Sequence, residues 1–293
     1  MATIAPLSTA VEKPDWDHID TVLLDLDGTL LDLVFDNHFW LEIVPAAYAA
    51  ARMTTLDAAR TELAPRFRAC EGTLPWYCID HWSRELGLDI EALKRANTER
   101  IAWLPGAERF LLRLRAAGKR VVLLTNSHPR VLRIKDEKTG VLSYFDAAFT
   151  SHEFGVEKEA VRFWEAVRAV EPFDPQRSLF ADDSAAVLRA AQRAGIRWVY
   201  GVRRPDSAQT IREHANVAVV DSVGDLVGHL SRPCGRTRRD YRLRALSVRA
   251  AASAATTATS GAPRAAPASA AATPSAAASA GTPAVAFTTA AAM

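Results

Sequence analysis

Two acidic side chains close the first strongly apolar run of the chain. Asp25 ends the run at residues 21–25, and Asp27 follows with one residue between them. In an extended chain this spacing places both carboxylates on one side, and Gly28 then lets the backbone turn sharply. A pair of carboxylates held in this way can attack an electrophile, transfer a proton or bind a hard cation.

Three further polar groups follow at comparable places in the chain. They are Thr125 with Asn126, Lys158, and Asp182 with Asp183. The first and third groups end apolar runs, whereas Lys158 lies at the start of a helical pattern. Taken singly, each group has an ordinary interpretation as a surface turn, a helix cap or a solvated lysine. Their combination and their order in the chain are what indicate a shared site.

Short apolar runs alternate with helical patterns along most of the chain. The expected strands are residues 21–25, 120–125, 147–151, 178–182, 198–202 and 217–221, and the expected helices between them include 107–117, 159–170 and 185–194. This alternation is typical of an α/β fold built on a doubly wound, Rossmann-like parallel sheet. The carboxyl ends of such strands meet at one edge of the sheet, where ligands bind, so we expect the polar groups to converge there.

One stretch interrupts the alternation. Between about residues 39 and 100 no strand is expected, and helical patterns cover residues 40–52, 56–69 and 90–101. An insertion of this kind, directly after the first strand, predicts a helical cap over the strand ends. We therefore expect a catalytic core at residues 18–37 and 104–230, with the cap at residues 38–103.

The two ends of the sequence differ from its middle in composition. Residues 1–17 form a polar leader that we expect to be mobile. After residue 230, an arginine-rich run at 232–249 precedes a segment made almost entirely of Ala, Ser, Thr, Pro and Gly. Such a segment has few large side chains to bury, so we expect residues 231–293 to be disordered.

Composition narrows the class of protein. The 293 residues include 49% hydrophobic and 24% charged side chains, which is ordinary for a globular protein, and the net charge of +2 gives no case for a nucleic-acid partner. The arginine-rich run leaves that partner as an alternative. The three cysteines are an odd number without a CxxC pair, which argues against a disulfide framework or a zinc site. No secretory signal or membrane span is recognisable, so we expect a cytoplasmic monomer without a membrane partner.

The polar groups also carry a family resemblance. The segment DLDGTL at residues 25–30 resembles the first motif of the haloacid dehalogenase-like (HAD) hydrolases. The segments LLTN at 123–126, Lys158 and FADDS at 180–184 resemble the second, third and fourth motifs in order. The resemblance covers about residues 20–226. It implies a Rossmann-like fold and a phosphomonoester hydrolase that uses Mg²⁺.

The resemblance also implies a role for each motif residue. Asp25 would attack phosphorus and form an aspartyl-phosphate, and Asp27 would protonate the leaving oxygen and then deprotonate the attacking water. Thr125 would hold the phosphoryl oxygens, and Lys158 would place a positive charge against them. The ligands of Mg²⁺ would be Asp25, the main-chain carbonyl of Asp27, Asp183, and Asp182 either directly or through water.

A narrower resemblance points to the purine 5′-nucleotidases that act on GMP and IMP. The segments that carry it are residues 30–37 with 39–40, residues 76–78 with Trp82, and residues 125–129. We expect the aromatic side chains of Trp76, Tyr77 and Trp82 either to stack on a base or to form the core of the cap. The candidates for contact with the purine nucleoside monophosphate are Thr125, Asn126, Asn37 and His128.

Other functions stay open on the sequence. A sugar-phosphate phosphatase or a phosphoglucomutase-like enzyme would share the fold and the catalytic set. A catalytically inactive binding protein is a further alternative, although it would have no reason to retain all four motifs. Displacement of halide is disfavoured, because it needs neither an acid nor a metal and would leave Asp27 and the acidic pair without a role.

Overall fold

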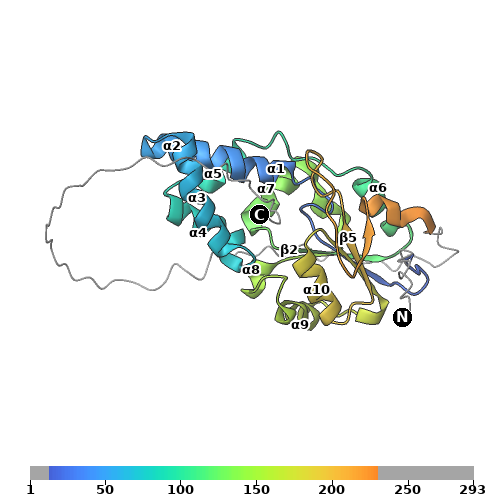
Figure 1. Cartoon of the computed structure of the whole chain (residues 1–293). Coiled ribbons are helices and arrows are strands. Elements are labelled where there is room, and N and C mark those ends of the chain that lie inside the picture. Colours follow the sequence, from blue (N-terminus) through green and yellow to red (C-terminus); the bar gives the residue numbers. More distant parts are fainter. Residues whose placement is uncertain (1–12, 230–293) are drawn as a thin grey trace, which may run out of the picture. The chain divides into compact units, whose positions relative to one another are not determined.

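The computed structural model describes residues 13–229, which include one six-stranded parallel sheet (Figure 1). Its strands are β1 (Thr21–Leu24), β2 (Arg120–Thr125), β3 (Ala147–Thr150), β4 (Ser178–Asp182), β5 (Trp198–Val202) and β6 (Ala218–Val220). Their order across the sheet is β3-β2-β1-β4-β5-β6, and helices cover both faces. The expected fold class, a doubly wound parallel sheet with a helical insertion after the first strand, is confirmed.

β1 lies at the centre of the sheet, where the order of the strands changes direction. It pairs with β2 on one side and with β4 on the other, and Leu24 lies opposite both Leu123 and Ala181. The backbone N–H of Asp25 donates to the carbonyl of Ala181 at 3.1 Å. The segments that leave β1, β2 and β4 therefore start side by side, at the crevice where doubly wound sheets bind ligands.

Alternate residues of the central strands supply two hydrophobic cores, one on each face of the sheet. On one face the strands pack against α6 (Ala107–Ala116) and α7 (Pro129–Thr139). On the other face they pack against α9 (Val161–Val170) and α10 (Ala185–Arg193). Because both faces are covered, the strands are continuous apolar runs in the sequence, which is why the sequence pattern located them.

The segment between β1 and β2, here called the helical insertion (residues 34–95), forms a third core. It contains α1 (Val34–His38), a π-helical turn (Phe39–Ile43), α2 (Val44–Arg52), α3 (Leu56–Cys70), a 3₁₀ turn (Leu74–Tyr77), α4 (Ile79–Leu86) and α5 (Ile90–Arg95). Trp40, Trp76 and Trp82 meet edge to face in its centre. The chain enters and leaves the insertion side by side, because the N–H of Leu104 donates to the carbonyl of Leu30 at 2.8 Å.

The helix expected at residues 90–101 is shorter in the structure, for a local reason. α5 ends at Arg95. The side-chain amide of Asn97 donates to the carbonyl of Leu93 at 2.8 Å, and so occupies the acceptor that the backbone N–H of Asn97 would use in a continuing helix. Asparagine side chains commonly compete with helical hydrogen bonds in this way.

One side chain in the described part of the expected leader is packed against the rest of the chain. Trp16 is buried, and its indole N–H donates to the carbonyl of Leu226 at 3.2 Å. The expectations for residues 1–12 and for the tail from residue 230 onward lie outside the described residues. Between residues 13 and 229, no helix has both the length and the apolar character that a membrane span requires.

Candidate active site

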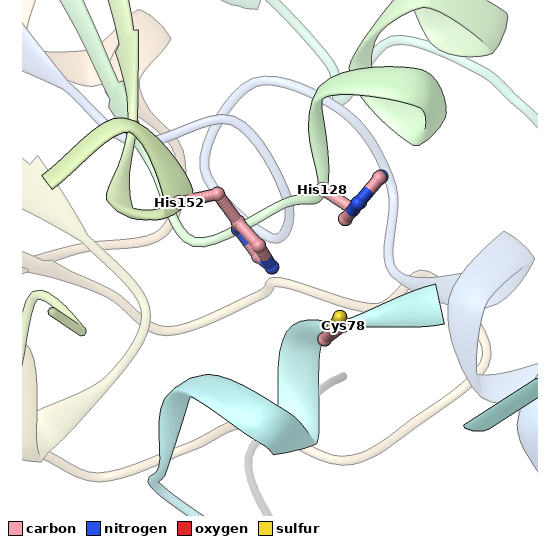
Figure 2. A group of neighbouring side chains, drawn as sticks. All are labelled: Cys78, His128 and His152. Carbon is pink, nitrogen blue, oxygen red and sulfur yellow. The ribbon is translucent and has the colours of Figure 1, made fainter. Parts of the chain in front are cut away.

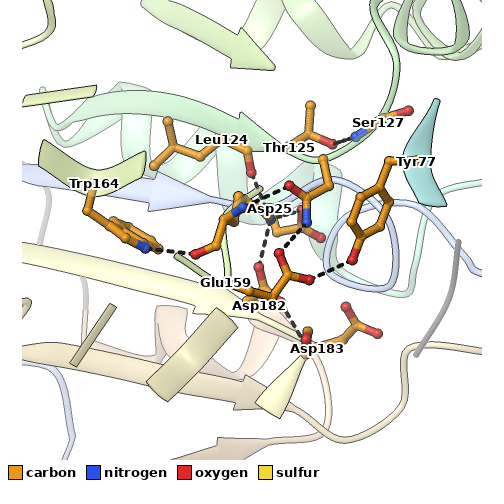
Figure 3. Close-up of polar contacts among 12 residues, drawn as sticks. Asp25, Tyr77, Leu124, Thr125, Ser127, Glu159, Trp164, Asp182 and Asp183 are labelled. Carbon is orange, nitrogen blue, oxygen red and sulfur yellow. Dashed lines mark hydrogen bonds and ion pairs between the residues drawn. The ribbon is translucent and has the colours of Figure 1, made fainter. Parts of the chain in front are cut away.

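The polar groups that the sequence singled out converge at the carboxyl edge of the sheet. One pocket there is lined by Asp25, Asp27, Thr125, Asn126, His128, Lys158, Asp182 and Asp183. The ends of β1, β2 and β4 supply all of these residues except Lys158, which comes from the loop before α9. Figure 3 shows Asp25, Thr125, Asp182 and Asp183 of this set in one close-up. Trp76 and Tyr77 of the helical insertion line the same pocket, so the insertion contributes one of its walls.

Lys158 is a buried cation at the centre of the site. Its ammonium donates to Asp25 Oδ1, to Asp182 Oδ2 at 2.8 Å and to the carbonyl of Leu124 at 3.0 Å. These contacts use all three N–H bonds of the ammonium, so the charge is held between the two carboxylates. Burial would lower the pKa of Lys158, but Asp182 and Asp25 raise it above its ordinary value. The side chain is therefore charged.

The loop that carries Lys158 is fixed by side chains from both sides. The N–H of Lys158 donates to Asn126 Oδ1 at 3.0 Å, and its carbonyl accepts from the indole of Trp164 at 2.9 Å. Glu159 accepts from Asn126 Nδ2 at 3.0 Å and from the Tyr77 hydroxyl at 2.6 Å. Because side chains occupy the backbone N–H and carbonyl of Lys158, α9 begins at Val161 rather than at the expected residue 159. The bond from Tyr77 to Glu159 also connects the helical insertion to this loop.

Three buried carboxylates form a cluster beside Lys158. Asp25, Asp182 and Asp183 each bring one carboxylate oxygen within 4.8 Å of the others. Burial raises the pKa of all three, to about 7 for Asp25, against the opposing charges of Lys158 and Arg212. Three acids beside two cations leave an excess of negative charge when all three are ionised. Oxygen donors suit hard divalent ions, so the residues present fit such a cation.

Two residues shape this cluster in ways that sequence reasoning missed. Arg212 Nη1 donates to Asp183 Oδ2 at 2.6 Å, and no motif singled Arg212 out. Gly28 packs against the same carboxylate: its φ is +83°, and a Cβ built on it would lie 2.7 Å from Asp183 Cγ. Glycine was expected here for a turn, and the structure adds that the position has no room for a side chain.

A second buried network surrounds Asp27. Lys135 Nζ lies 2.7 Å from Asp27 Oδ1 and 2.6 Å from Asp36 Oδ2. Lys94 Nζ lies 2.8 Å from the other oxygen of Asp36. Burial raises the pKa of Asp27 to about 6, while Lys135 opposes the shift. Burial would also raise the pKa of Asp36, but the two lysines bring it below its ordinary value, so an ionised Asp36 holds Lys135 against Asp27.

Sequence reasoning missed this network, although one signal was available. Lys135 follows the buried Val131 by four positions in α7, and Lys94 follows the buried Ile90 by four positions in α5. A lysine at that spacing lies on the apolar face of its helix, where an unpaired charge is costly. A buried acidic partner could therefore have been expected, but nothing in the sequence indicated Asp36.

The structure separates the four candidates for substrate contact. Thr125 and His128 line the pocket, whereas Asn126, which also lines it, uses its amide to hold the Lys158 loop. Asn37 is not part of the pocket lining in the described chain, and its side-chain amide donates to Asp206 Oδ2 at 2.5 Å. The structure therefore does not support a contact between Asn37 and the substrate.

The three aromatic candidates also divide. Tyr77 and Trp76 line the pocket, although Trp76 is also buried in the core of the helical insertion, whereas Trp82 is 1% exposed and lies in that core without lining the pocket. Ile79, Trp82 and Leu86 form the apolar stripe of α4, as expected for a helix packed on one face. The indole N–H of Trp82 donates to the carbonyl of Trp76 at 2.8 Å. Of the two roles expected for this side chain, base stacking or core packing, Trp82 therefore has the second.

The chain is similar to known proteins over most of the described residues. A family model described as haloacid dehalogenase-like hydrolase matches residues 19–195. The chain is 44% identical over 192 residues to the GMP/IMP nucleotidase YrfG of Escherichia coli (strain K12), a match that covers 66% of this chain and 86% of that protein. It is 28% identical over 226 residues to Enolase-phosphatase E1 of Gluconacetobacter diazotrophicus, covering 71% of this chain and 94% of that protein.

Solved structures share the fold at lower identity. A HAD phosphatase from Thermococcus onnurineus matches with a TM-score of 0.63 and 20% identity, covering 73% of this chain and 99% of that chain. A putative beta-phosphoglucomutase from Thermotoga maritima matches with a TM-score of 0.54 and 16% identity, covering 71% and 97%. At this level of identity, these two similarities show only that the fold is shared.

Proposed function

The chain belongs to the haloacid dehalogenase-like hydrolase family and is a phosphatase, and from that premise we propose that it is a Mg²⁺-dependent 5′-nucleotidase acting on GMP and IMP through an aspartyl-phosphate. The observation that carries the chemistry is the convergence of Asp25, Asp27 and Lys158 with a buried acidic cluster in one pocket. The similarity to a GMP/IMP nucleotidase supports the substrate class.

In the first half of the reaction, Asp25 is the nucleophile. One of its carboxylate oxygens attacks phosphorus in line with the leaving oxygen, so that a new O–P bond forms as the ester O–P bond breaks. Protonated Asp27 gives its proton to the leaving oxygen. Burial raises the pKa of Asp27 to about 6, so a fraction of the enzyme holds this proton near neutral pH.

In the second half, Asp27 acts as a base. It takes a proton from water, whose oxygen attacks the phosphorus of the aspartyl-phosphate and releases inorganic phosphate together with the free Asp25 carboxylate. Asp27 ends this step protonated, as the next turnover requires. Lys158 offsets negative charge on the phosphoryl group throughout, from a position already fixed before substrate binds.

The acidic cluster would hold the metal. Asp25, Asp182 and Asp183 would supply carboxylate oxygens, and Asp27 would add its main-chain carbonyl. When bound, Mg²⁺ would neutralise charge on these carboxylates and on the phosphoryl oxygens. Lys158 already bonds to Asp25 and Asp182, so both carboxylates stay oriented by a permanent charge.

Lys135→Met tests whether the buried network controls the proton on Asp27. Removing the ammonium removes the charge that opposes the raised pKa of Asp27. We expect the limb of the kcat–pH profile that reports Asp27 to move to higher pH, because a larger fraction of the enzyme then holds the proton that Asp27 gives to the leaving oxygen. Lys94→Met is the matched control, because it removes an equally buried ammonium that contacts Asp36 and not Asp27. An unchanged profile for Lys135→Met, or equal shifts in both variants, would contradict this role.

Selection of a purine requires contacts beyond the phosphate. Trp76 and Tyr77 line the pocket from the helical insertion, and His128 lines it from the start of α7. A base stacked on one aromatic side chain gains about 1–3 kcal/mol. The keto group at purine position six of GMP and IMP accepts a hydrogen bond, whereas the amino group of AMP donates one. His128 is the candidate donor, since Asn37 is bound to Asp206.

A substrate panel tests this proposal. The measurement is kcat/KM for GMP, IMP, AMP, UMP and a set of hexose phosphates in Mg²⁺. Because the hexose phosphates lack a ring to stack, we expect GMP and IMP to exceed them by at least about fivefold. We also expect AMP to fall below GMP and IMP, because a fixed donor would face its amino group. A hexose phosphate that is better than GMP and IMP by about tenfold or more would contradict the nucleotidase proposal and leave only the phosphatase chemistry.

A further inference from the structure

A second cluster of side chains lies beside the pocket, and the reaction steps on Asp25 and Asp27 do not use it. Cys78 is the N-cap of α4, His128 is the N-cap of α7, and His152 belongs to α8 (Ser151–Phe154). Figure 2 shows the three side chains pointing toward one another from these separate segments. One nitrogen or sulfur atom of each lies within 4.8 Å of the others. The cluster thus brings together three side chains that commonly bind transition metals.

His152 gives an independent reason to expect a ligand. Both of its ring nitrogens are buried, and neither has a hydrogen-bond partner within residues 13–229. A buried imidazole normally satisfies its N–H and its lone pair, and leaving them without partners costs free energy. Burial and the neighbouring His128 lower the pKa of His152 to about 4, so its lone pair is available to a cation at neutral pH.

The other two side chains are held only by long contacts. His128 Nδ1 accepts from the N–H of Arg130 at 3.3 Å, and its Nε2 lies 3.6 Å from Asp80 Oδ2. Cys78 Sγ accepts from the N–H of His81 at 3.4 Å. Contacts of this length are weak, so His128 and Cys78 can exchange them for bonds to a metal ion at little cost in free energy. Asp80 also places a negative charge next to the cluster, which favours a cation there.

We propose that Cys78, His128 and His152 bind a borderline divalent ion such as Zn²⁺. Bonds of about 2.0–2.3 Å in a tetrahedral site place the ligand atoms roughly 3.3–3.8 Å apart. The ligand atoms here lie within 4.8 Å of one another, so the side chains close by no more than about 1.5 Å when the ion binds. Binding breaks the S–H bond of Cys78, forms an S–Zn bond and releases one proton to solvent. Water fills the fourth position, and the ring nitrogen of His128 that does not bind the ion keeps the N–H that the proposed contact with the purine requires.

The ion would join the helical insertion to the sheet domain. Cys78 belongs to the insertion, whereas His128 and His152 follow β2 and β3. His128 lines the active-site pocket, and so do Tyr77 and Ile79, the chain neighbours of Cys78. A bound ion therefore restrains the insertion at the wall of the pocket and slows the passage of substrate and product. Nitrogen and sulfur donors favour zinc over magnesium, so Mg²⁺ does not fill this site.

Alkylation of the wild-type chain tests the site directly. The protein is treated with iodoacetamide with and without Zn²⁺, in saturating Mg²⁺ so that the acidic cluster is occupied, and each cysteine is followed by peptide mass spectrometry. We expect Zn²⁺ to slow the alkylation of Cys78 by at least about tenfold. Cys70 is the internal control: its sulfur lies 3.8 Å from His81, and it belongs to no three-residue cluster in the described chain. Equal protection of both cysteines, or of neither, overturns the proposal.

Two serine variants extend the test to affinity. Cys78→Ser keeps a residue that caps helices well, and Cys70→Ser makes the same change elsewhere in the helical insertion. The Kd for Zn²⁺ is measured on the full chain by competition with a chromophoric chelator in excess Mg²⁺. We expect this Kd to rise by at least about tenfold in Cys78→Ser and to stay unchanged in Cys70→Ser. His152→Asn should give a comparable loss through a second ligand. An unchanged Kd in all three variants overturns the proposal, and because no turnover is measured, that result leaves the proposed function untouched.

Discussion

Asp25→Asn is expected to lower kcat by at least about a thousandfold while the protein remains folded. The amide has nearly the shape of the carboxylate, but it carries no negative charge with which to attack phosphorus. Lys158 keeps its bonds to Asp182 and to the carbonyl of Leu124, so the positive charge of the site stays in place. The measurement is the release of inorganic phosphate from GMP at saturating substrate.

The melting temperature of the same variant separates chemistry from folding. Burial raises the pKa of Asp25 to about 7, so above that pH the ionised carboxylate destabilises the metal-free folded state. A neutral replacement should therefore leave the melting temperature at pH 8 equal or higher. Asp32→Asn is the matched control, because Asp32 is also buried and its Oδ1 accepts from the N–H groups of Val34 and Ser207, as an amide oxygen can. Full turnover by folded Asp25→Asn would contradict the nucleophile assignment.

The part of the site that could be predicted lies where the fold is most regular. β1 and β4 are buried along their whole length, so apolar runs marked them in the sequence. Parallel strands bring the residues at their carboxyl ends to one edge, which is why Asp25, Thr125 and Asp182 converge from distant parts of the chain. Lys158 comes from a loop rather than a strand, and only the family resemblance distinguished it from a surface lysine.

The parts that could not be predicted depend on how helices pack. Asp36 meets Lys94 and Lys135 because α1, α5 and α7 lie together, and no spacing in the sequence encodes that arrangement. Asn37, next to Asp36 in α1, bonds to a residue that follows β5. The proposed zinc site has the same origin. Its ligands come from three separate segments, so the absence of a CxxC pair, which argued against a zinc site, carried no information about it.

Gly28→Ala is expected to damage the acidic cluster from within the first motif. The backbone there has a φ of +83°, which costs an alanine roughly 1–2 kcal/mol. The new Cβ would lie 2.7 Å from Cγ and 2.8 Å from Oδ2 of Asp183, and 2.9 Å from Cδ1 of Leu33. Contacts this short force a displacement, and Asp183 must then move relative to Asp25 and Asp182. A metal held by the three carboxylates would lose one well-placed ligand.

The dependence of the initial rate on Mg²⁺ measures this loss. We expect Gly28→Ala to raise the Mg²⁺ concentration at half-maximal rate by at least about tenfold and to lower the maximal rate by about a hundredfold. Gly140→Ala is the matched control, since Gly140 has a φ of +66° but a Cβ there meets no atom within 4 Å, so that only backbone strain is added. Equal metal dependence in the two variants would remove the support for Asp183 as a ligand. A loss confined to Gly28→Ala would tie the glycine of the first motif to the acids of the fourth through direct contact.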